Sequence, residues 1–145
     1  MAIAQAMCTS FKQELLQAEH DFDNGAHQFR IALYTQTSDT SLSATTTVYI
    51  TANEVSGTGY TAKGFALTNV TPTAISTTAI ADFSPDATWT TATFTARGAL
   101  IFNDSHASDA AVLVLDFGAD KTATAGTFTV AFPAADASNA IIRIA

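Results

Sequence analysis

The residue types of a hydrolase triad occur together between Asp104 and Asp109, where Ser105 directly precedes His106. A working triad needs a nucleophile on a rigid turn and a base that a separate carboxylate orients. Residues adjacent in sequence cannot usually face each other in that geometry. The segment is therefore more typical of a polar turn between two strands, and we expect a protein without enzyme activity.

Two close glycines and a lysine between Gly57 and Gly64 could form a phosphate-binding loop. The common phosphate patterns place a strand before such a loop and a helix after it. Here the following residues, Phe65–Thr68, are typical of a strand. The glycines are better suited to supply positive φ angles in a turn, and we expect no nucleotide or other cofactor.

Asp21, Asp23 and Gly25 resemble the beginning of a calcium-binding loop, because alternating carboxylates can converge on a hard cation. The twelfth position, counted from Asp21, is Ala32, where that loop requires a bidentate glutamate. One cysteine, Cys8, and three dispersed histidines are also too few for a zinc site. We therefore expect no bound metal.

The aromatic residues Trp89, Tyr34, Tyr49 and Tyr60 could stack on a sugar. Ten phenylalanines accompany them, and packing in the core is the commoner role of such side chains. A shallow groove that exposed Trp89 or a tyrosine would instead indicate a carbohydrate-binding module.

Charge and the distribution of apolar residues argue against two classes of partner, nucleic acid and membrane. Thirteen acidic residues against six basic ones give a net charge of −7, and the basic residues are scattered singly. No nucleic-acid-binding surface is indicated. No apolar run approaches the roughly 20 residues needed to cross a bilayer. The start of the chain also lacks the basic and apolar regions of a signal peptide. We expect a soluble protein with neither a nucleic-acid nor a membrane partner.

One helix is predicted, over Ser10–His20. Ser10 and Gln13 have the spacing of a capping box, and Phe11 and Leu15 follow on one helical face. The turn-forming residues of Asp21–Gly25 end the helix. Residues 1–25 are thus expected to form an N-terminal arm with a short helix, and residues 26–145 a β-sandwich domain.

From His27 onward the apolar residues alternate with polar ones, which is the period of a half-buried strand. Turn clusters separate the alternating segments, and about eight short strands in this length are typical of an antiparallel β-sandwich or jelly roll. The fold class is therefore predicted to be all-β. The expected strands lie near Phe29–Tyr34, Thr46–Thr51, Phe65–Val70, Ala74–Phe83, Thr91–Asn103, Ala111–Phe117, Thr127–Phe132 and Ala140–Ile144.

The run Ala111–Phe117 is apolar on both faces, so we expect its strand at the centre of a sheet or under the helix. Val112, Leu113, Val114 and Leu115 are predicted to be among the most buried residues.

The N-terminal arm carries more apolar residues than one short helix needs against a sandwich closed by its own strands. Terminal segments are normally disordered unless something holds them. We therefore expect the arm to contact a partner through four side chains: Ile3, Met7, Phe11 and Leu15.

Five short motifs are specific as a set: Phe29–Thr35, Asn53–Thr61, Phe94–Phe102, Leu115–Lys121 and Ala140–Ala145. In this order, and over nearly the whole chain, they resemble a family of small virion structural proteins of tailed bacteriophages, including phages of cyanobacteria. The resemblance implies residence in the virion after synthesis in the host cytoplasm, and it brings no catalytic residues.

Small β-sandwiches of this kind include capsid cement, or decoration, proteins that bridge and stabilise major capsid subunits. We expect this role, with the major capsid protein or other virion proteins as partners and with a homo-oligomeric state. The alternatives are a neck or tail adaptor, a tail-fibre component, and a carbohydrate-binding β-sandwich module.

Overall fold

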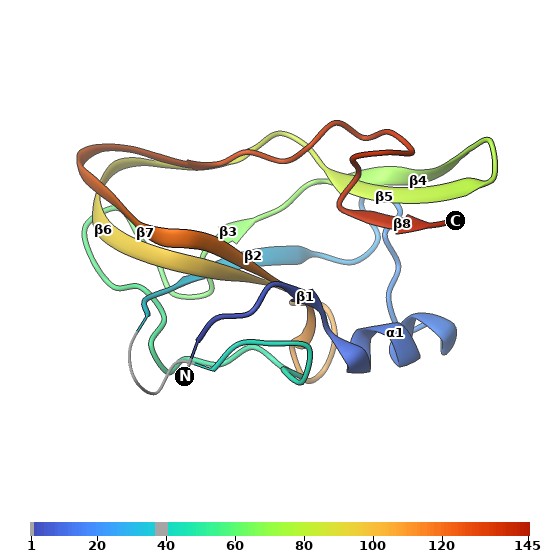
Figure 1. Cartoon of the computed structure of the whole chain (residues 1–145), viewed down its shortest axis with the longest axis horizontal. Helices are drawn as coiled ribbons and strands as arrows, with labels where there is room; N and C mark the ends of the chain where they lie inside the picture. Colours follow the sequence, from blue (N-terminus) through green and yellow to red (C-terminus); the bar gives the residue numbers. More distant parts are fainter. Residues whose placement is uncertain (1, 37–40) are drawn as a thin grey trace.

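Two antiparallel sheets form the layers of the fold in the computed structural model, which describes residues 2–36 and 41–145 (Figure 1). The all-β sandwich prediction is confirmed. The smaller sheet has the order β4 (Asn69–Ile75), β5 (Thr78–Phe83), β8 (Ile142–Ile144). The larger sheet has the order β1 (Ala6–Met7), β7 (Ala110–Val130), β6 (Ala87–Asn103), β2 (Phe29–Tyr34), β3 (Phe65–Ala66).

The β6–β7 hairpin is the longest feature of the fold, and it joins two predicted strands, Ala111–Phe117 and Thr127–Phe132, into one. Its register shifts where Arg97 alone lies opposite residues 117–120 of β7. Such a bulge bends a ladder, and both strands curve from the lower layer to the upper layer at the left of Figure 1. The Arg97 guanidinium pairs with Asp116 at 3.1 Å beside the bulge.

Several strand boundaries differ from the prediction. The expected strand over Ala74–Phe83 is a hairpin instead, because Ser76 adopts a positive φ of 57° between β4 and β5. The segment expected as a strand over Thr46–Thr51 is not a strand; its ladder pairing is limited to an isolated bridge from Val48 to Ala110.

The core fills the space between the layers with aromatic rings. Trp89 packs edge-on against Phe128 with ring centroids 6.0 Å apart, and Phe22 stacks on Phe29 at 4.3 Å. The first pair joins opposite residues of β6 and β7, and the second lies under the smaller sheet, where Phe29 also contacts Phe83. The β6–β7 hairpin therefore supplies one aromatic group of the core, and the packing of β2 against β5 supplies the other.

The expected burial is found for three of the four residues of the apolar run, although β7 lies beside the short edge strand β1 and β6 takes the centre of the sheet. Val112, Leu113 and Val114 are buried, as expected. Leu115 is only partly buried, because β1 pairs with β7 only at Leu113 and Val114 and leaves the next part of the edge open. The prediction that Leu115 is among the most buried residues was wrong.

The helix α1 (Thr9–Leu16) is shorter than predicted and begins differently. Its N-cap is Cys8, no side chain caps it, and the Ser10 hydroxyl is buried without a partner. The capping-box prediction was therefore wrong. A positive φ of 61° at Ala18 follows the helix end. With eight residues, this helix is too short to cross a bilayer, and it is the only helix in the described part of the chain.

The N-terminal segment does not stand apart from the sandwich. Its strand β1 extends the larger sheet, and Ile3, Cys8 and Phe11 belong to the same core cluster as the strands. Gly98 of β6 makes room for this packing, since a β-carbon there would come within 2.9 Å of the Ile3 side chain. Residues 2–25 are thus part of one core, and the expected separate arm is not what the structure contains.

Candidate functional site

Ser105 and His106 are engaged with different partners. The Ser105 hydroxyl accepts a hydrogen bond from the Gln28 N–H at 2.8 Å. The His106 ring bonds the Glu19 carboxylate through Nε2 at 2.9 Å and the Ser108 hydroxyl through Nδ1 at 3.0 Å. The two residues therefore serve the turn between β6 and β7, as the sequence predicted for this segment.

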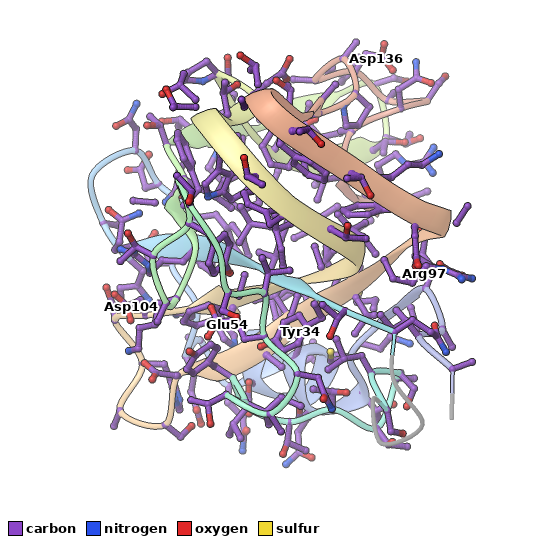
Figure 2. All side chains as sticks on the ribbon, turned by 90° about the vertical axis from the view of Figure 1, so that its left-hand side faces the viewer. Tyr34, Glu54, Arg97, Asp104 and Asp136 are labelled. Atoms are coloured by element: carbon purple, nitrogen blue, oxygen red, sulfur yellow. The ribbon has the colours of Figure 1, made fainter. Side chains whose placement is uncertain are left out.

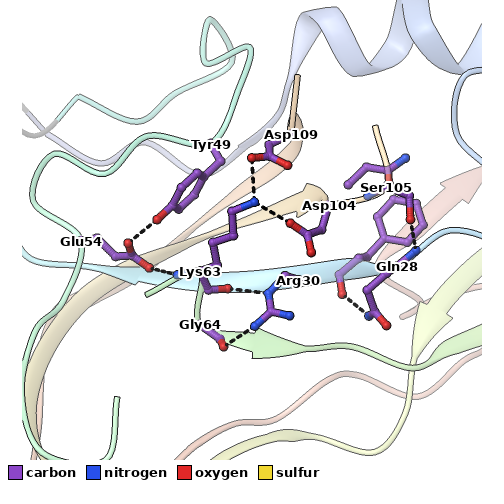
Figure 3. Close-up of polar contacts among 11 residues, drawn as sticks. Gln28, Arg30, Tyr49, Glu54, Lys63, Gly64, Asp104, Ser105 and Asp109 are labelled. Carbon is purple, nitrogen blue, oxygen red and sulfur yellow. Dashed lines mark hydrogen bonds and ion pairs between the residues drawn. The ribbon is translucent and has the colours of Figure 1, made fainter. Parts of the chain in front are cut away.

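Lys63 joins the glycine-rich segment to this same turn. Its Nζ donates to Asp104 at 2.7 Å and to Asp109 at 2.9 Å, and it lies over the Tyr49 ring at 5.7 Å (Figure 3). Hydrogen bonds to Asp104, and then to Asp109, raise the pKa of Lys63. Two carboxylates already neutralise this ammonium, so it is not arranged to receive a phosphate. All three side chains are partly exposed, which keeps the contribution of the pairs to stability small.

Glu54 is the acceptor that organises the loop before β3. Its Oε2 accepts from the Tyr49 hydroxyl at 2.5 Å, and its Oε1 accepts from the Tyr60 hydroxyl at 2.8 Å and from the Lys63 N–H at 2.7 Å. The Tyr60 hydroxyl in turn accepts from the Leu33 N–H of β2 at 2.9 Å. Burial first, and Glu54 next, raise the pKa of the Tyr49 hydroxyl to about 12. This polar network attaches the loop to the edge of the larger sheet.

Figure 2 places Glu54 and Asp104 on one side of the molecule, beside Tyr34 and away from Arg97. The Tyr34 hydroxyl donates to the Ile50 carbonyl at 2.6 Å, so the same loop is held at a second point. These contacts fix the position of the loop before β3 against the larger sheet.

Replacing Glu54 by glutamine is expected to lower the free energy of unfolding by about 1.5–3 kcal/mol, the usual range for hydrogen bonds to a charged group. The NH₂ group of the new amide would face one of the groups that now donate a hydrogen bond to the Glu54 carboxylate. Urea denaturation measures the loss. Tyr49→Phe is the matched variant that removes one of these bonds and should cost less; equal stability of Glu54→Gln and wild type would contradict the assigned role.

The aromatic residues considered for sugar binding pack against other side chains of the protein. Trp89 and Tyr34 are buried, and Tyr60 stacks on Trp89 with centroids 6.1 Å apart. The Tyr49 ring stacks on Phe102 at 4.8 Å. Tyr49 and Tyr60 are partly exposed, but the exposed large apolar side chains of the described residues include no aromatic one, so the exposed aromatic platform that would indicate a carbohydrate-binding module is not seen there.

The carboxylates of the acidic turn accept bonds from their own backbone. Asp21 Oδ1 accepts from the Asp23 N–H at 2.9 Å, and Asp23 Oδ1 accepts from the Asn24 N–H at 3.0 Å and the Thr71 hydroxyl at 2.9 Å. This is the local bonding that favours Asp in turns. Over residues 2–36 and 41–145, no group of histidine, cysteine and carboxylate side chains is arranged to hold a metal ion.

A histidine cluster, defined as His20, His27, His106 and Asn103, was not foreseen from the sequence. Asn103 Nδ2 lies 3.1 Å from His20 Nδ1 and 3.0 Å from His27 Nδ1, and the His20 and His106 rings stack at 5.8 Å. Its members come from the segment after α1 and from the end of β6 with the following turn. The antiparallel pairing of β2 with β6, in which Phe29 lies opposite Asn103, brings these segments together.

The exposed large apolar side chains of the described residues come from three elements at one end of the molecule. Leu16 of α1 is 90% exposed, Ile144 of β8 57% and Ile75 of β4 39%, and Figure 1 shows these elements together at the right. Between α1 and the smaller sheet lies an apolar groove of about 280 Å³, whose lining includes Leu15 and Ile142. We call Leu15, Leu16, Ile75, Ile144 and this groove the end surface.

The four residues expected to contact a partner occupy different environments in the structure. Ile3 and Phe11 are buried in the core, so their expected contact with a partner was wrong for the folded protein. Met7, on β1, is partly buried against the core. Leu15 is also partly buried but lines the groove of the end surface, so it is the one predicted residue that remains part of a candidate contact.

Comparison with known proteins found no matching family model, no matching curated protein and no matching solved structure.

Proposed function

We propose that this protein is a non-enzymatic structural subunit of a tailed-phage virion, and that it acts as a capsid cement protein bridging major capsid subunits. The resemblance of its five sequence motifs to small phage virion proteins supports a structural role in the virion. The all-β sandwich is compatible with this role. The function then consists of the surface that the protein presents to neighbouring subunits.

The observation that carries the proposal is the end surface. Leu15 and the exposed Ile144 line an apolar groove, and the exposed Leu16 follows Leu15 in α1, whereas the polar clusters elsewhere bond internally. Apolar side chains grouped on a surface commonly mark a protein contact. A stable contact buries roughly 800 Å² per partner, and binding only to the assembled shell stabilises it by mass action.

Leu16→Lys combined with Ile144→Lys is expected to abolish binding to capsid shells that lack the protein, while the fold is retained. Both side chains point largely to solvent, so the free protein should lose little stability. Two charges buried at a subunit contact would oppose association. Co-sedimentation with shells measures binding, and survival of the shells on heating measures cementing.

The matched control is Thr124→Lys combined with Thr129→Lys, which adds the same charge at exposed positions of β7 outside the end surface. It should bind and protect shells as wild type does. Equal binding by both double variants would show that the contact lies elsewhere. If the wild-type protein does not bind shells but binds neck or tail complexes, the cement role is wrong. The protein would then be an adaptor or a fibre component.

A further inference from the structure

We propose that the histidine cluster is an acid-sensitive contact, which ties the segment after α1 to the turn between β6 and β7 and opens when His20 takes up a proton. The inference does not depend on the proposed function. It would make one end of the molecule responsive to mild acid while the strands remain paired.

The geometry begins with Asn103, which is fully buried at the end of β6. Its Oδ1 accepts a hydrogen bond from the Ser105 N–H at 3.0 Å, which fixes the orientation of the amide. Nδ2 therefore faces the two rings and donates one hydrogen to His20 Nδ1 and the other to His27 Nδ1. Both acceptor nitrogens must be unprotonated for these bonds to form.

The second nitrogen of His20 confirms this assignment. Nε2 lies 2.8 Å from the Glu14 carboxylate, an acceptor when ionised, so Nε2 carries the hydrogen of the neutral ring. A second proton has to go to Nδ1, where it would face the N–H of Asn103. Turning the Asn103 amide over does not relieve the conflict, because its NH₂ would then face the Ser105 N–H. Protonation of His20 therefore costs at least one buried hydrogen bond.

The charged groups around His20 act in both directions. Glu14, from α1, favours the protonated ring, whereas His106, stacked from the β6–β7 turn, and His27 oppose it once charged. Glu19 bonds His106 and not His20. Burial is the largest of these influences, and it lowers the pKa of His20 below 6.5 in spite of the Glu14 bond.

The direction of the pH effect follows from this lowered pKa. An unfolded or locally opened chain binds a proton to His20 near the ordinary value of about 6.5, whereas the closed cluster binds it only at lower pH. The closed state is thus fully favoured above about pH 6.5 and loses stability as the pH falls below that value. Opening separates residues 17–28 from residues 103–109.

The test is hydrogen exchange by NMR on the full chain at about pH 7.5 and about pH 5, the range in which histidine titrates. Amides of residues 17–28 and 103–109 should have clearly lower protection factors at the lower pH than at the higher pH, because the closed cluster resists protonation of His20. Val112 and Val114 in β7 should keep theirs. Equal loss in β7 and in the cluster would mean general unfolding and would overturn the proposal.

Asn103→Asp is a variant that should reverse the pH dependence of the cluster. A carboxylate in place of the amide NH₂ can accept from protonated rings, so protection of the cluster should rise as the pH falls. Gln13→Glu, which adds the same charge on the exposed side of α1, should behave as wild type.

A second test, the NMR titration of the His20 ring, uses the wild-type protein and needs no variant. The His20 ring, followed by NMR, should be the Nε2–H tautomer at about pH 7.5 and should titrate below 6.5. Titration at or above that value would overturn the proposal, whether or not Asn103→Asp folds.

Discussion

Replacing Phe11 by alanine is expected to lower the free energy of unfolding by about 3–5 kcal/mol, the range measured for large aromatic truncations in cores. Phe11 is fully buried, lies 4.9 Å from the His20 ring and meets the Phe22 ring edge-on at 5.9 Å. The cavity would open between α1 and the sheets. Small domains have only about 5–15 kcal/mol in total, so much of the stability would be lost. Guanidinium denaturation measures the change.

Leu16→Ala is the matched control on the same helix. Leu16 is 90% exposed, so its truncation should change the stability by no more than about 0.5 kcal/mol. A loss for Phe11→Ala as small as that for Leu16→Ala would mean that the N-terminal segment is a loosely attached arm after all. Deleting residues 1–19 extends the same argument: it removes β1 and α1 from the core and should yield a chain that does not fold.

Replacing Gly64 by alanine is expected to lower the free energy of unfolding by about 2–5 kcal/mol, from two causes that add. Gly64 has φ +64°, a conformation that costs an L-residue about 1–2 kcal/mol. A β-carbon there would also overlap the Ile31 carbonyl oxygen and come within 2.9 Å of the Ala32 Cα. Overpacking of this kind costs about 1–3 kcal/mol or more. The strain would separate the loop before β3 from β2.

Gly118→Ala separates the two causes. Gly118 also has a positive φ, +75°, but no atom lies within 4 Å of the β-carbon position. Its replacement by alanine should lower the free energy of unfolding only by the strain of the positive φ angle, about 1–2 kcal/mol. Thermal unfolding of both variants measures the difference. If Gly64→Ala costs no more than Gly118→Ala, the close approach of the loop to β2 is not as described.

The fold class was predictable because alternation of apolar and polar residues depends only on local sequence. Phe29–Tyr34 was predicted with its observed boundaries. The continuous β7 was not predicted, since Gly118 and the residues around it have the composition of a turn but form a bulge inside a strand. The alternating pattern cannot distinguish a bulge from a loop, because both interrupt the period of two.

The N-terminal contact was misjudged for a related reason. Ile3 and Phe11 were assigned to a partner because the sandwich was assumed to close with its own strands. The larger sheet instead leaves an edge at β7 that β1 covers, and Gly98 provides the space for Ile3. A two-residue strand such as β1 has no periodic signal, so nothing in the sequence indicated that the segment completes the core.

The polar clusters could not be predicted at all from spacing. Lys63 meets Asp104 and Asp109 from positions more than forty residues away, and His20 meets Asn103 across 83 residues. Each partner was visible in sequence only as part of a local motif, as a glycine-rich loop or as a serine–histidine pair. Tertiary pairing of the strands decides which of these motifs share a site.

A structural subunit of a phage shell must be present in purified virions in many copies. Quantitative gel analysis or mass spectrometry against the major capsid protein gives this number per particle. We expect hundreds of copies, in a fixed ratio to the major capsid protein. A dozen copies or fewer would assign the protein to the neck or tail, and its absence from purified particles would contradict a virion role altogether.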